Sequence, residues 1–258
     1  MTRMTFLAAL AGLLSSTAAL AASDLPVRAE LLPGWREGAQ HIAGLRLVLE
    51  PGWKTYWRAP GDAGIPPEFD WAGSKNLGAV RVDYPVPAIY DVSGVRTIGY
   101  ADEVVFPLTL TATDPARPID LSAGVQLGVC QDVCIPVTFR ISGTLPTDGA
   151  HDARVARARA DRPTAGGAMT CRITPISDGL RLEVAFAMPS MPGPAETVIE
   201  TADPSVWVSA PEVSVSGGMA QASADLVPPD AVPFALERDG LRLTVIGGGR
   251  AVELKGCD

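Results

Sequence analysis

Short runs of alternating apolar and polar residues recur along most of the chain, separated by glycine and proline. Clear examples are residues 42–49, 104–110, 180–186 and 241–246. A period of two places every second side chain on one face, which is typical of strands with one buried face. The pattern predicts an all-β protein, and several short strands at this spacing indicate β-sandwiches.

One segment differs from these strands in composition. Residues 151–162 are rich in Ala, Arg and Asp, contain no Gly, and are followed by Pro163. This composition predicts a short helix that ends at the proline. We therefore expect a linker at 149–167 between a first domain at 22–148 and a second β-sandwich domain at 168–258.

The first residues are typical of a secretory signal peptide. Arg3 supplies a positive charge, residues 6–14 form a short apolar segment, and residues 19–21 are a small-x-small cleavage site. We expect residues 1–21 to be removed on export. No later run approaches the ~18 apolar residues of a membrane-spanning helix, so no transmembrane segment is predicted in the mature chain.

Charge and cysteine number restrict the function classes. The formal net charge is −8 and the basic residues form no patch, which argues against nucleic acid or an anionic membrane surface as a partner. The chain has four cysteines. In an oxidising compartment this even number predicts two disulfides.

Cys130 and Cys134 stand between two alternating runs, at 125–129 and 137–141. This arrangement predicts two antiparallel strands with the cysteines at the mouth of the hairpin, where they can pair with each other. A thiol pair at such a rim is accessible to the thiolate of another protein, as disulfide exchange requires. The spacing also fits a structural clip or a two-thiolate Cu(I) site.

Zinc is disfavoured, because the only histidines, His41 and His151, show no ligand spacing. Cys171 and Cys257 lie near the two ends of the second domain. Pairing them would close a loop of about 87 residues, worth at most ~4–5 kcal/mol in the chain-entropy model. We expect this pair to be a structural disulfide. The alternative is a second redox pair, since a near-terminal Cys257 is open to exchange.

The order of motifs resembles a known family. Residues 52–58 (GWKTYWR), 60–67 (PGDAGIPP), 99–108 (GY-x-DEVVFPL) and 128–137 (GVCQDVCIPV) follow one another in the first domain. Over residues 25–145 the chain resembles the periplasmic N-terminal domain of the thiol-disulfide interchange reductase DsbD, and more closely that of the copper-sensitivity suppressor ScsB.

The resemblance implies an immunoglobulin-like fold for the first domain. Together with the strand spacing of the second domain, we expect two immunoglobulin-like β-sandwich domains joined by the short helical linker. It also implies a periplasmic protein-disulfide oxidoreductase without a cofactor. Its partners would be periplasmic thioredoxin-like proteins and, because the chain lacks the family's transmembrane electron carrier, a membrane electron donor supplied in trans. The alternatives are a Cu(I)-binding copper-tolerance protein and a non-catalytic, disulfide-stapled interaction module.

The resemblance also assigns site residues. Cys130 and Cys134 match the redox pair of the family, and Cys134 would be the sulfur that is attacked first. Tyr56 matches an aromatic residue beside the pair. The loop at residues 90–95 matches a cap over the disulfide, and its site-lining or capping residues would be Tyr90, Asp91 and Val92.

Overall fold

The structure is a computed structural model that describes residues 25–61, 64–92 and 95–258. Across these residues the regular structure consists of strands β1 to β19, one α-helix and a short 3-10 helix at Arg238–Gly240. The predicted all-β fold is confirmed. The predicted signal peptide lies outside the described residues. Among the described residues, no helix is long and apolar enough to cross a membrane.

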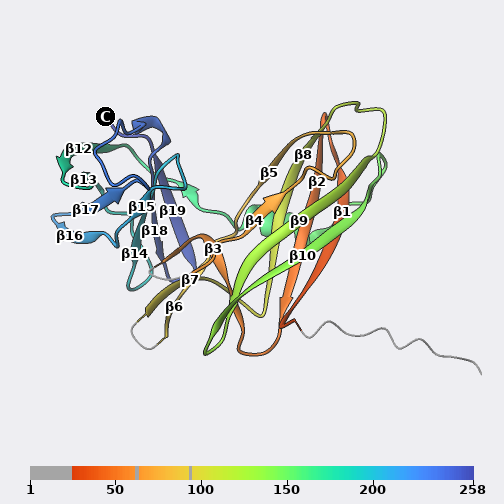
Figure 1. The fold of residues 1–258 in the computed structure, drawn as a ribbon, viewed down its shortest axis with the longest axis horizontal. Helices are drawn as coiled ribbons and strands as arrows, with labels where there is room; N and C mark the ends of the chain where they lie inside the picture. The colour runs from red at the N-terminus through yellow and green to blue at the C-terminus, as the bar shows by residue number, and fades with distance from the viewer. Residues whose placement is uncertain (1–24, 62–63, 93–94) are drawn as a thin grey trace, which may run out of the picture.

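The first sandwich consists of two sheets that pack face to face (Figure 1). One sheet has the strand order β1 (Val27–Glu37), β2 (Gln40–Leu49), β8 (Glu103–Ala112) and β5 (Leu77–Val82). The other has the order β10 (Cys134–Leu145), β9 (Ile119–Cys130), β3 (Lys54–Gly61), β7 (Val95–Ala101) and β6 (Ala88–Val92), with β4 (Glu68–Asp70) also paired to β9.

Alternating residues of β9 form the centre of the first core. Val125, Leu127 and Val129 are each 0% exposed, as their alternation predicts. They pack in one buried cluster with Trp57 of β3 and Phe106 of β8. The two sheets of the first sandwich therefore pack against each other beneath β9, the strand that ends at Cys130.

The second sandwich also has two sheets. One has the order β11 (Thr164–Ala165), β19 (Arg250–Lys255), β18 (Arg242–Gly247) and β14 (Glu196–Glu200). The other has the order β12 (Met169–Ile176), β13 (Gly179–Ala187), β17 (Met219–Val227) and β15 (Trp207–Val208), with β16 (Glu212–Ser216) also on β17. Its core joins Leu182 and Phe186 of β13 to Leu243 and Val245 of β18.

The predicted helical segment forms α1 (Ala153–Ala160), which begins after Asp152. The Asp152 carboxylate accepts a hydrogen bond from the backbone N–H of Arg154 at 2.8 Å, which satisfies one of the free donors of the helix start. Val155 is completely buried against the first sandwich, in a cluster with Trp35 and Val105. After the helix, β11 pairs in parallel with β19. The linker region thus packs on both sandwiches.

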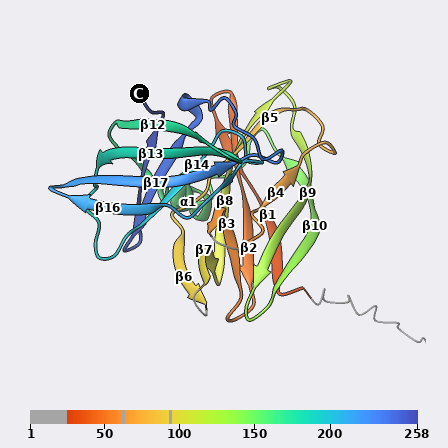
Figure 2. The same ribbon diagram turned by 60° about the vertical axis from the view of Figure 1, so that its left-hand side comes forward.

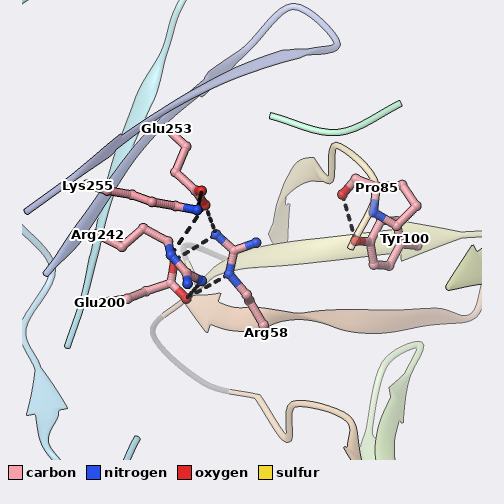
Figure 3. A network of polar contacts seen from close by, with 7 residues as sticks. All are labelled: Arg58, Pro85, Tyr100, Glu200, Arg242, Glu253 and Lys255. Atoms are coloured by element: carbon pink, nitrogen blue, oxygen red, sulfur yellow. Dashed lines mark hydrogen bonds and ion pairs between the residues drawn. The ribbon is translucent and has the colours of Figure 1, made fainter. Parts of the chain in front are cut away.

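An ion-pair network joins β3 to the second sandwich (Figure 3). The Arg58 guanidinium donates to both carboxylate oxygens of Glu200, at 2.8 and 3.0 Å, and to Glu253 at 2.6 Å. Arg242 and Lys255 lie 3.4 and 3.1 Å from Glu253. Because the side chains of Arg58, Glu200 and Glu253 are only 14–16% exposed, water screens these charges weakly.

Apolar residues continue this contact between the sandwiches. Val198 of β14 and Ile246 of β18 belong to the same buried cluster as Ile98 of β7. Arg96, two residues before Ile98, pairs with Glu196 at 2.8 Å. Strand β3, which lies next to the cysteine hairpin, and its neighbour β7 are therefore packed directly against the second sandwich.

Candidate functional site

The cysteine pair closes the β9–β10 hairpin. Cys130 is the last residue of β9, Cys134 is the first of β10, and the two are directly opposite each other in the register. Their sulfurs form a disulfide, with Cα atoms 4.0 Å apart. Cys134 is exposed and Cys130 is half-buried. Val133 in the turn is 69% exposed. An incoming thiolate therefore has more direct access to Cys134.

Tyr56 of β3 lies under the disulfide. Its hydroxyl donates a hydrogen bond to Cys134 Sγ at 3.0 Å. The side chain is only 1% exposed, and this burial raises the pKa of Tyr56. The phenol consequently keeps its proton at neutral pH and stays a hydrogen-bond donor. The contact places Tyr56 beside the pair, where the family resemblance locates an aromatic residue.

Two glycines leave the space that the Tyr56 ring fills. A Cβ atom on Gly128 would lie 2.6 Å from a ring carbon of Tyr56, and one on Gly64 would lie 2.7 Å from the ring. Both distances are far below van der Waals contact. Gly128 also donates its backbone N–H to the Ile65 carbonyl at 2.9 Å. The segment with Gly64 and Ile65, between β3 and β4, therefore packs on one side of the ring, and β9 packs on the other.

Lys54 is a neighbour of the pair that the sequence does not single out. It is directly opposite Cys130 where β3 pairs with β9. Its ammonium lies 5.3 Å from the centre of the Tyr90 ring. A lysine at the start of a strand is ordinarily a solvent-exposed residue, so the register is the signal that identifies it.

The segment predicted as a capping loop is a hairpin instead. Tyr90, Asp91 and Val92 belong to β6, which pairs with β7, and residues 93–94 lie outside the described residues. Pairing with β7 gives this polar segment the backbone hydrogen bonds that a loop would obtain from water. Figures 1 and 2 both show the β6–β7 and β9–β10 hairpins extending toward the same end of the first sandwich. The capping role of the three residues stays a prediction.

The second disulfide joins Cys171 of β12 to Cys257 beyond β19, and so connects the two sheets of the second sandwich. The chain end pairs with β12, because the Cys171 N–H donates to the Asp258 carbonyl at 3.1 Å. Cys257 is only 8% exposed despite its near-terminal position. Its sulfur is therefore poorly accessible to an external thiolate, which favours the structural role.

No group of three or more His, Cys, Asp or Glu side chains that could hold a metal ion occurs among the described residues. The Cu(I) alternative would use two ligands, Cys130 and Cys134, and these are bonded to each other here. Binding would require that the disulfide be reduced first, because the thiolate is the metal ligand.

Comparisons with known proteins address the first sandwich and the whole chain separately. Residues 24–146 match the family described as thiol:disulfide interchange protein DsbD, N-terminal. The crystal structure of the N-terminal periplasmic domain of ScsB from Proteus mirabilis is similar, with a TM-score of 0.63 and 23% identity over 89% of this chain and 91% of that one. No curated protein sequence matches the chain significantly. The structural match covers both sandwiches and indicates a shared fold.

Proposed function

We propose that this protein, whose residues 24–146 form a domain of the DsbD N-terminal family, exchanges disulfides in the periplasm through Cys130 and Cys134. In this role it relays electrons from a membrane reductase to thioredoxin-like proteins. The observation that carries the proposal is the position of the pair. The disulfide closes a hairpin end and Cys134 is exposed, so that a partner thiolate can reach its sulfur.

Reduction of the pair proceeds in two exchanges. A thiolate of the donor attacks Cys134 Sγ, a mixed disulfide forms, and the electron pair of the broken bond leaves on Cys130 Sγ. The second thiolate of the donor then attacks the donor sulfur of the mixed disulfide and releases Cys134 as a thiolate. Two electrons have moved to Cys130 and Cys134, and the donor dithiol has become a disulfide. The acceptor disulfide takes these electrons by the reverse steps.

The surroundings support separate tasks for the neighbouring residues. Tyr56 donates a hydrogen bond to Cys134 Sγ, where negative charge appears in the second exchange. The β6–β7 hairpin, with Tyr90, Asp91 and Val92, limits access to the half-buried Cys130 side of the pair until a partner docks, while Cys134 stays exposed. Cys171 and Cys257 remain a structural disulfide in the second sandwich.

A trapping experiment tests the proposal. In the variant Cys130→Ala, the Cys134 thiolate can attack a disulfide-bonded thioredoxin-like protein, but Cys130 is no longer there to resolve the mixed disulfide. We expect a covalent adduct on non-reducing electrophoresis that dithiothreitol releases. The matched variant Cys134→Ala should form much less adduct, because its remaining sulfur is half-buried. No adduct, or equal adducts with both variants, would contradict the proposal.

A further inference from the structure

Three side chains form a row across β3, β9 and β10. Lys54 is directly opposite Cys130, and Cys130 is directly opposite Cys134. Directly opposite residues of antiparallel strands project from the same face, with Cβ atoms about 4.5–5.5 Å apart. Lys54 therefore flanks Cys130 on the side away from Cys134. Tyr56, two residues after Lys54, projects from the same face and reaches Cys134.

Two contacts define where the Lys54 ammonium lies while the disulfide is closed, near Gly52 and on the β6 side of β3. Its ammonium donates to the Gly52 carbonyl at 3.5 Å and lies 5.3 Å from the centre of the Tyr90 ring. A cation over a tyrosine face is attracted by the negative face of the ring. Burial, together with the Asp102 carboxylate, raises the pKa of Tyr90, so the ring stays a neutral phenol. An ammonium has three N–H donors, so it can also approach a sulfur.

We propose that Lys54 stabilises the thiolate of Cys130, while the Tyr56 hydroxyl stabilises the thiolate of Cys134. This inference rests on the proposed function, in which each of the two sulfurs carries negative charge at a different step. When a donor thiolate bonds to Cys134, the disulfide breaks and its electron pair leaves on Cys130 Sγ. Lys54 stands directly opposite that residue on the neighbouring strand β3. A more stable leaving thiolate departs faster.

Other charged and titratable groups lie near Lys54 and the pair. Asp132 lies in the hairpin turn between the cysteines, Asp102 raises the pKa of Tyr90 of β6, and Tyr56 shares β3 with Lys54. A carboxylate next to the pair, such as Asp132, disfavours further negative charge there. The ammonium of Lys54 offsets this effect at the half-buried sulfur, where the surrounding water provides less stabilisation.

The test uses the full mature chain with Lys54→Met, and Lys75→Met as the matched control for loss of one positive charge. Lys75 is exposed and pairs at the backbone with Asp120, outside the cysteine row. After reduction with dithiothreitol, each cysteine is alkylated with iodoacetamide over a pH series and scored by mass. We expect the Cys130 profile of Lys54→Met to move about one pH unit upward. The Cys134 profile and both profiles of Lys75→Met should stay unchanged, and Lys54→Arg should restore most of the Cys130 profile.

Two results would overturn the inference. The first leaves the proposed function intact, and the second overturns it as well. If the pair of the unmodified protein is reduced and exchanges, but its Cys130 profile equals that of Lys54→Met, Lys54 does not act on the thiolate and the proposed function stands. If the pair of the unmodified protein resists dithiothreitol, the proposed function fails and this inference fails with it.

Discussion

The hydroxyl of Tyr56 lies 3.0 Å from the sulfur of Cys134, although the two residues are 78 positions apart in the chain. This contact connects the aromatic strand β3 to the exposed end of the cysteine hairpin. A buried donor aimed at a sulfur is a favourable environment for a thiolate, because hydrogen bonds to ionised acceptors are stronger than those to neutral ones.

Removing this donor should make the pair harder to reduce. In Tyr56→Phe the reduced form loses a hydrogen bond to a thiolate, and we expect the reduction potential to fall by about 30 mV, which corresponds to ~1.4 kcal/mol for a two-electron couple. Tyr100→Phe is the matched control, because it removes a buried hydrogen bond to the Pro85 carbonyl (Figure 3) from a tyrosine that packs in the core cluster. Equal potentials for Tyr56→Phe and the unmodified protein would show that the contact has no redox role.

Enlarging Gly128 should displace the tyrosine ring. A Cβ atom at this position would meet Tyr56 at 2.6 Å, so we expect Gly128→Ala to lose about 1–3 kcal/mol of unfolding free energy and to shift the redox potential as Tyr56→Phe does. Gly167 is the control, since a Cβ atom there meets nothing within 4 Å. Urea unfolding measures both variants, and equal stability of Gly128→Ala and Gly167→Ala would contradict the packing argument.

The Arg58 network should hold the two sandwiches together. Arg58→Met removes the hydrogen-bonded partner of Glu200 and Glu253 in a weakly solvated site, while the pairs with Arg242 and Lys255 remain, and we expect a loss of about 1–3 kcal/mol. The exposed pair of Arg181 and Asp225 is a useful reference, because Arg181→Met should cost less than ~1 kcal/mol. A double-mutant cycle with Arg58→Met and Glu200→Gln measures the coupling, and strict additivity would mean that this pair contributes nothing.

His41 should make the first sandwich sensitive to mild acid. The ring is 1% exposed, contacts the Pro33 carbonyl at 2.6 Å, and burial lowers its pKa below the ordinary value of 6.5. The unfolded chain then binds the proton more readily than the folded one. The free energy of unfolding is therefore highest well above pH 6.5, and it decreases as the pH falls through 6.5 toward the lower pKa of the folded state. Urea midpoints between pH 7.5 and 5 should decrease in the unmodified protein and decrease less in His41→Gln. Parallel curves would contradict the assignment.

The strands at the cysteine hairpin could be predicted because each carries its own alternation. Val125, Leu127 and Val129 are buried at the predicted spacing, since one face of β9 packs on the core. The segment at residues 90–95 was predicted as a loop because glycine and polar side chains favour turns. That prediction was wrong for β6, whose backbone is paired by β7. Strand pairing of this kind depends on the neighbour, which a local pattern does not contain.

The surroundings of the site depend on contacts between distant parts of the chain. Lys54 is identified by its register with Cys130, and Gly128 by its contact with Tyr56. Neither relationship can be recognised from the residues that surround each position in the sequence. Arg58 meets Glu200 and Glu253 across 142 and 195 residues. Charged residues at these positions are typical of a solvated surface, so their pairing between the sandwiches could not be predicted from the sequence.

The most direct test of the central claim is a redox titration of the mature protein in glutathione and dithiothreitol buffers, with alkylation and mass analysis of each cysteine. Structural disulfides typically have potentials below about −300 mV, and exchange-active ones lie higher. We expect Cys130–Cys134 to titrate well above that value while Cys171–Cys257 stays closed. If both disulfides resist reduction together, the electron-relay account is contradicted and the protein is a disulfide-stapled module without exchange activity.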